Sequence, residues 1–181
     1  MTRSALAVGT ALLLLAIAPS ANSQAKYDPG VSDSEIKPGQ TAPYSGPVSA
    51  YCTFGRASVA YFAMINEGGG INGRKINLVT ADDGFSPPKT VEQTRKLVES
   101  DGVLLMFAPV GTSINMAVRK YLNDRKIPQL LLQSGISKFN DPKNFPWSLS
   151  GLPNHETEVR LRQAHPCRQV AGQGRDSVPE R

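Results

Sequence analysis

Apolar runs and amphipathic stretches alternate between residues 35 and 133, which predicts strands and helices in turn. Short apolar runs are typical of buried strands, whereas apolar residues at spacings of three and four are typical of a helix with one buried face. The expected strands are residues 35–42, 76–81, 103–107 and 127–133, and the expected helices are residues 54–65, 90–100 and 114–126. This order predicts a doubly wound α/β fold, a parallel sheet with helices on both faces.

The apolar positions also predict which side of each helix is buried. In the first helix these positions are Phe54, Ala57, Tyr61, Met64 and Ile65; in the second, Val91, Thr94, Leu97 and Val98; in the third, Ile114, Ala117, Val118, Tyr121 and Leu122. Pro38 lies within the first expected strand. Because proline cannot donate a backbone hydrogen bond, that strand must be broken, bulged or at an edge near Pro38.

The turn Gly111-Thr112-Ser113 joins an expected strand directly to an expected helix. The first N–H groups of a helix have no partner within it, and together with the positive helix end they favour a carboxylate or phosphate. Gly111 would let a ligand approach the main chain. The alternative interpretation is that Thr112 or Ser113 only caps the helix, since every helix start has donors to satisfy.

A second polar turn, Gln133-Ser134-Gly135, follows the next expected strand. Ligands of parallel sheets bind beyond the carboxyl ends of the strands, where both turns fall. Two similar turns at one edge of the sheet predict a binding site there.

Two other patterns have weaker claims to a function. Gly68, Gly70 and Gly73 match the spacing of a dinucleotide-binding loop, but here a helix precedes them and a strand follows, which is the reverse of the required order. We interpret them as a helix end and a turn. Asp82 and Asp83 could serve an exported enzyme, but no His, Cys or Glu lies nearby, so a solvated strand end is the favoured interpretation.

The charge distribution argues against nucleic acid as a partner. The whole chain has a net charge of +5, yet residues 26–157 hold 14 Lys or Arg and 12 Asp or Glu, so most of the excess lies at the two ends. No basic stripe interleaved with aromatic residues is present. The sequence contains no catalytic Ser/His/Asp or Cys/His set and no spacing typical of metal ligands, so we expect no enzyme activity, no metal and no cofactor.

The first 25 residues are typical of a secretory signal peptide. Arg3 is followed by the apolar run 5–18, which is too short to span a bilayer as a helix, and then by small residues suited to signal peptidase. An uncleaved anchor is the alternative. We therefore expect export, and we expect Cys52 and Cys167 to be free.

Several short motifs follow one another between residues 27 and 157 in a distinctive order and spacing. They are Tyr44-Ser45-Gly46-Pro47, Tyr51, Met64-Ile65-Asn66, Gly69-Gly70-Ile71-Asn72-Gly73-Arg74, Asp82-Asp83, Ser86-Pro87 with Lys89, Gly111-Thr112 and Ser134-Gly135. This series resembles the first lobe of the periplasmic branched-chain amino-acid-binding proteins, the type I periplasmic solute-binding proteins of ABC importers.

The resemblance implies a ligand-binding lobe over residues 26–157 that receives an amino acid or a related small acid or amide. It implies that Gly111, Thr112 and Ser113 bind the ligand carboxylate, that Gln133, Ser134 and Gly135 contact the ligand backbone, and that Tyr51 walls the pocket. It also implies a periplasmic location and an ABC permease in the inner membrane as partner. A sensory domain of the same fold is an alternative function.

The resemblance ends near Thr157, where such proteins continue into a long helix and a second lobe. Residues 158–181 instead hold five Arg and no Lys, with little periodicity. We expect a disordered tail there, produced by a change of reading frame, and a missing second lobe; a short, basic, disordered tail of natural origin is the alternative. Because part of the partner for the ligand ammonium would be absent, we expect weak binding.

Overall fold

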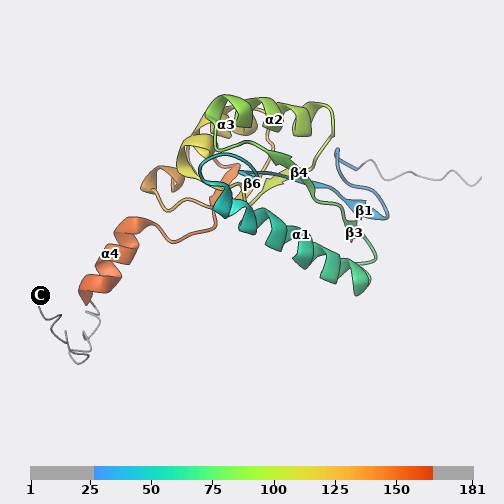
Figure 1. Ribbon diagram of the computed structural model, residues 1–181, viewed down its shortest axis with the longest axis horizontal. Coiled ribbons are helices and arrows are strands. Elements are labelled where there is room, and N and C mark those ends of the chain that lie inside the picture. The colour runs from blue at the N-terminus through green and yellow to red at the C-terminus, as the bar shows by residue number, and fades with distance from the viewer. Residues whose placement is uncertain (1–26, 165–181) are drawn as a thin grey trace, which may run out of the picture.

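Five parallel strands form the main sheet of the computed structural model, which describes residues 27–164. The strands are β2 (Pro38–Ala42), β4 (Val79–Asp82), β5 (Leu105–Phe107), β6 (Gln129–Leu132) and β7 (Ser148–Ser150), and their order across the sheet is β4-β2-β5-β6-β7. Helix α1 (Cys52–Glu67) lies on one face, while α2 (Pro87–Glu99) and α3 (Thr112–Asp124) lie on the other (Figure 1). The expected doubly wound α/β fold is confirmed.

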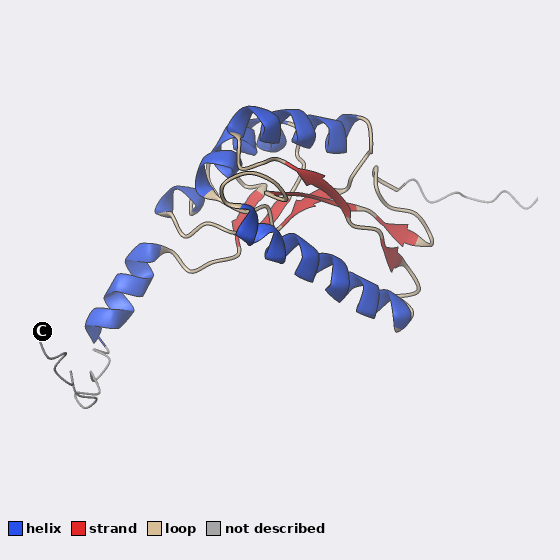
Figure 2. Cartoon of the chain, in the orientation of Figure 1, coloured by secondary structure: helices blue, strands red, loops and turns tan. Residues whose placement is uncertain are grey.

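The connections between strands reverse direction at β2. The chain passes from β2 through α1 to the edge strand β4, and then returns through α2 to β5 on the other side of β2. Since right-handed crossovers in opposite directions place their helices on opposite faces, this reversal explains the division between α1 and the pair α2 and α3 (Figure 2). The switch point between β2 and β5 is where ligands of open α/β sheets bind.

The first expected strand is broken near Pro38, as its proline requires. Its first part is β1 (Glu35–Ile36), which pairs with β3 (Lys75–Ile76) in a separate two-stranded sheet. Pro38 is the first residue of β2, the position in a strand where a missing donor is tolerated.

The second expected strand, residues 76–81, is divided as well. The amide side chain of Asn66, near the end of α1, donates to the Ile76 carbonyl and accepts from the Ile76 N–H at 2.8 and 2.7 Å. Asn66 thus satisfies the edge of β3 that faces away from β1, and pairing with β2 begins only at Val79.

Strand β7 is absent from the sequence-based prediction. It consists of Ser-Leu-Ser and has neither an apolar run nor a useful alternation, so its pairing with β6 alone defines it. The register between the two strands shifts at Leu131, which has a φ of 56°.

The core lies between the sheet and the pair α2 and α3. Its buried members come from both helices, from β5 and from the segment just before β5: Leu97, Val103, Met106, Val118 and Leu122. The expected faces of α2 and α3 are therefore largely correct, although Ala117 is exposed.

The expected buried face of α1 is wrong at four of its five positions, since only Ile65 is partly buried. Tyr61 and Met64 are 56% and 57% exposed, and Phe54 is 45% exposed. The side that faces the sheet is one position further along: Gly55 is buried, and the Phe62 ring packs on the Phe107 ring with a centroid distance of 5.1 Å.

Helix α4 (His155–Ala164) corrects the expectation of disorder from residue 158 onward, as far as residue 164. The Asn154 side chain accepts the Thr157 N–H at 2.8 Å, and Glu156 and Glu158 lie in the first turn, where acidic residues stabilise a helix. The rest of the expected tail, including Cys167, and the expected signal peptide lie outside the described residues. Within residues 27–164, no helix has the length and apolar character needed to cross a membrane.

Candidate functional site

A pocket of about 560 Å³ opens at the carboxyl ends of the strands, next to the switch point. Its walls come from the segments that follow β2, β4, β5 and β6: Val48, Tyr51, Phe85, Val110, Gly111, Thr112, Ser113 and Gln133. The volume is within the range of small-molecule sites, and the location is the one expected for ligands of such sheets. The pocket thus brings together Tyr51, the Gly111–Ser113 turn and Gln133, as the sequence predicted.

Buried amide side chains hold the turn before α3 in place. The Asn115 side chain donates to the carbonyls of Pro109 and Gly111, and its oxygen accepts from the Gln129 amide at 2.7 Å. Asn115 and Gln129 are both fully buried and cannot hydrogen-bond to water, so these bonds satisfy polar groups that would otherwise have no partner. Sequence reasoning did not identify this pair, although a polar residue on a predicted apolar helix face is the signal that could have found it.

The start of α3 offers backbone donors to the pocket. Gly111 is the N-cap residue, with a φ of 114° that favours glycine, and its N–H donates to the Gln133 carbonyl at 3.2 Å. Among residues 27–164, the N–H groups of Thr112 and Ser113 have no acceptor. Neither of these side chains caps the helix, so the capping interpretation of Thr112 and Ser113 is wrong.

The two polar turns lie side by side. Val110 and Gln133 form a parallel bridge, and the hydroxyl oxygens of Thr112 and Ser134 are 2.8 Å apart. Ser134 is 4% exposed and does not line the pocket; it is hydrogen-bonded to Thr112, which does.

Gly135 also lies outside the pocket lining. The His155 ring covers it so closely that a Cβ on Gly135 would be 2.6 Å from the His155 Cε1. The His155 N–H also donates to the Gly135 carbonyl at 2.8 Å. Gly135 therefore packs against His155 at the start of α4.

The aromatic wall of the pocket is larger than the sequence predicted. Tyr51 is 52% exposed and stacks on Phe54 with a centroid distance of 6.2 Å. Val48, Phe85 and Val110 also line the pocket but were not predicted. The position of Phe85 just beyond the end of β4 is the signal that could have identified it, since that end lies at the same edge of the sheet.

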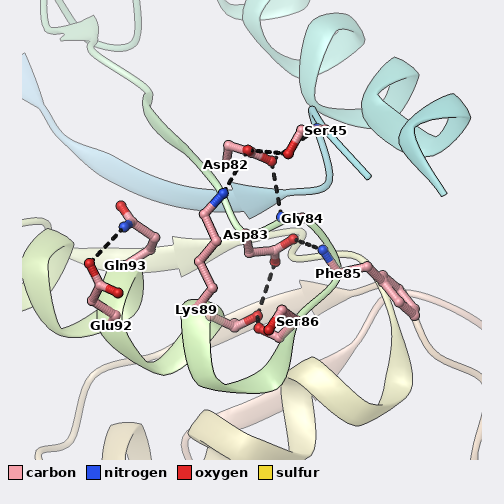
Figure 3. Close-up of polar contacts among 10 residues, drawn as sticks. Ser45, Asp82, Asp83, Gly84, Phe85, Ser86, Lys89, Glu92 and Gln93 are labelled. Atoms are coloured by element: carbon pink, nitrogen blue, oxygen red, sulfur yellow. Dashed lines mark hydrogen bonds and ion pairs between the residues drawn. The ribbon is translucent and has the colours of Figure 1, made fainter. Parts of the chain in front are cut away.

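The adjacent aspartates at the end of β4 point in different directions and have different partners (Figure 3). The Asp82 carboxylate accepts from the Ser45 N–H and hydroxyl, the Gly84 N–H and the Lys89 ammonium, the last at 2.8 Å. Partial burial opposes its ionisation, but the hydrogen bonds from Lys89 and Ser45 dominate and hold the pKa of Asp82 well below its ordinary value.

Asp83 is fully buried, so the interpretation of both aspartates as a solvated strand end is wrong. Burial raises the pKa of the Asp83 carboxyl, against the hydrogen bonds donated by the Phe85 N–H and the Thr90 hydroxyl. Both carboxyl groups are thus engaged in holding loops. Across residues 27–164, no group of three or more His, Cys, Asp or Glu side chains could hold a metal ion.

Comparison with known proteins adds to this geometry. Residues 35–171 match the family model described as periplasmic binding protein. The chain is 31% identical over 98 residues to the Leu/Ile/Val-binding protein BraC3 of Rhizobium johnstonii, a match covering 54% of this chain and 26% of that protein. It is 30% identical over 94 residues to the Leu/Ile/Val-binding protein homolog 3 of Brucella melitensis, covering 51% and 25%.

A solved structure shares the fold over a larger part of the chain. The extracellular ligand-binding receptor from Verminephrobacter eiseniae is 27% identical with a TM-score of 0.63, covering 72% of this chain and 38% of that one. The two matches to the curated Leu/Ile/Val-binding proteins each span about a quarter of the length of the relative.

Proposed function

Since this chain belongs to the periplasmic binding protein family, we propose that it is a solute receptor that binds an amino acid or a related small carboxylate or amide. The family is one of binding proteins rather than enzymes. The observation that carries the proposal is the start of α3: within residues 27–164 the N–H groups of Thr112 and Ser113 have no acceptor, and both residues line the pocket.

These donors suit a carboxylate. The positive end of the α3 dipole and the backbone amides of Thr112 and Ser113 act on the same side of the pocket, and the Thr112 hydroxyl can supply a third hydrogen bond. Hydrogen bonds to a charged group contribute about 1.5–3 kcal/mol each, so the carboxylate accounts for a large share of the affinity.

The other walls of the pocket suit an apolar group. Tyr51, Phe85, Val48 and Val110 present aromatic and aliphatic carbon toward the same space. A ligand with a carboxylate at one end and an aliphatic side chain at the other satisfies both sides, and the Leu/Ile/Val-binding names of the curated relatives support a branched-chain amino acid.

We also propose that the receptor works in the periplasm and delivers its ligand to an ABC permease in the inner membrane. The family and the motif series support this role. Genes for a permease and an ATPase beside the gene of this chain would agree with transport. A neighbouring sensor kinase, without transport genes, would contradict it.

Calorimetry of the purified chain against L-leucine, L-isoleucine and L-valine tests the binding function. We expect L-leucine to bind more tightly than L-leucinamide by at least about tenfold, because the amide cannot place a negative charge at the start of α3. Replacing Thr112 by valine removes the hydroxyl at nearly constant shape, and we expect affinity for L-leucine to fall by about tenfold.

Thr53 provides the matched control. It is exposed on α1, outside the pocket lining, so Thr53→Val should leave the affinity unchanged. Equal affinities for L-leucine and L-leucinamide would contradict the placement of the carboxylate. An absence of binding by all the amino acids tested would contradict the proposed function itself.

A further inference from the structure

Phe85 lies next to the donors at the start of α3. Its ring is so close to Gly111 that a Cβ on Gly111 would be 2.4 Å from the Phe85 Cε2. Both residues line the pocket together with Thr112 and Ser113. A carboxylate on those two amides therefore brings the atoms adjoining it toward the Phe85 ring.

The backbone at Phe85 is in a conformation that a bulky residue rarely adopts. Its φ is 60°, in the left-handed region that glycine prefers. The Asp83 carboxylate accepts the Phe85 N–H at 2.9 Å, while the Thr90 hydroxyl donates to its other oxygen at 3.3 Å (Figure 3). Strain of this kind persists where the surroundings fix it, and it is concentrated at ligand-binding sites.

Glycine or asparagine at position 85 would adopt this backbone at a lower cost than phenylalanine does. The ring itself is half-buried, with one edge on Gly111 and part of its surface in the pocket. A fully buried carboxyl fixes this strained aromatic residue at the edge of the pocket, which is the situation in which backbone strain accompanies a binding role.

We propose that Phe85 is the specificity-determining residue of the pocket and that Asp83 is the positioning residue that holds it there; this inference rests on the proposed function. The Phe85 ring occupies space beside the carboxylate, so the pocket favours an aliphatic ligand side chain over a bulkier aromatic one. Tyr51 closes the pocket on the side of the β2–α1 connection.

The test measures the affinities of L-leucine and L-phenylalanine for the full chain by calorimetry. In Phe85→Ala we expect binding of L-leucine to weaken by about tenfold, and the ratio of the two affinities to shift toward L-phenylalanine by at least about tenfold, since small differences in pocket size discriminate about 10–200-fold. Phe85→Gly should show the same shift, and since glycine adopts this backbone without the strain that alanine would keep, agreement between the two variants excludes strain at alanine as the cause.

Two substitutions of Asp83 separate its positioning role from a merely structural one. Asp83→Asn keeps an oxygen that accepts the Phe85 N–H, and it should retain the preference for L-leucine. Asp83→Ala releases the Phe85 backbone and should shift the preference as Phe85→Ala does. Tyr61→Ala removes an exposed ring of α1 outside the pocket lining and is the control that should change nothing.

Each outcome bears on a separate statement. An unchanged ratio of affinities in a folded Phe85→Gly protein would overturn the role of Phe85. An unchanged ratio in Asp83→Ala would overturn the positioning role of Asp83. If neither L-leucine nor any other amino acid bound to the unaltered chain, the proposed function would fail, and this inference with it.

Discussion

The two faces of the sheet are covered in different ways. Helices α2 and α3 pack on one face, contact each other and enclose a core of fully buried residues that includes Leu97, Met106 and Leu122. On the other face α1 stands alone and buries only Gly55 completely (Figure 1). Its outer face, which consists of Phe54, Ala57, Tyr61 and Met64, is exposed.

This difference shows where a hydrophobic pattern is informative and where it is not. The outward positions of α2 carry charges, so the apolar remainder identifies its buried side. Helix α1 has only Arg56 and Glu67 as charged residues, and apolar side chains lie all round it. The small residues Gly55, which is buried, and Ser58, whose hydroxyl accepts from the Gln40 amide of β2, lie on the side toward the sheet.

The largest expected effect is on the α2 and α3 face. Replacing Leu122, which is 1% exposed, by alanine leaves a cavity in the core, and we expect the free energy of unfolding to fall by about 2–5 kcal/mol. Val59→Ala on α1 is the matched control; because Val59 is 46% exposed, we expect a change within about 0.5 kcal/mol. Urea unfolding measures both, and similar losses in the two variants would contradict the difference between the faces.

An intermediate effect is expected where α1 meets the sheet. A Cβ on Gly55 would be 2.3 Å from the Tyr44 hydroxyl oxygen and 3.3 Å from the Ala42 Cβ. Gly55→Val should therefore force α1 outward or displace Tyr44, and we expect a loss of about 1–3 kcal/mol in urea unfolding.

Ala57→Val, two residues further along α1, is the control for Gly55→Val. It adds a branched side chain on the exposed outer face, where no neighbouring group has to move. The free energy of unfolding should therefore change only by the small difference in helix propensity between alanine and valine. A larger loss in Ala57→Val than in Gly55→Val would reverse the assignment of the two sides of α1.

The sequence predicted the order of the elements, the edge of the sheet that carries the site and four of the pocket-lining residues, because these follow from local periodicity and from the rule for ligands of parallel sheets. A fifth lining residue, Tyr51, was predicted from the family resemblance alone. It did not predict Phe85, the burial of Asp83 or the cover of His155 on Gly135. Each of these depends on how segments distant in sequence meet, which periodicity does not report.

The smallest expected effect tests the exposure of the outer face of α1 most directly. Met64→Lys puts a charge on a residue that is 57% exposed, and since lysine and methionine have similar helix propensities, we expect the free energy of unfolding to change by no more than about 0.5 kcal/mol. Phe62→Lys, two residues earlier, is the matched contrast. Phe62 packs on Phe107, so the substitution removes the aromatic contact, and the lysine charge must either be desolvated or displace the helix. We expect that variant to lose several times more stability, about 2 kcal/mol or more. Equal losses at the two positions would mean that the outer face of α1 is packed against other atoms in solution, and the contrast between the two faces of the sheet would then be incorrect.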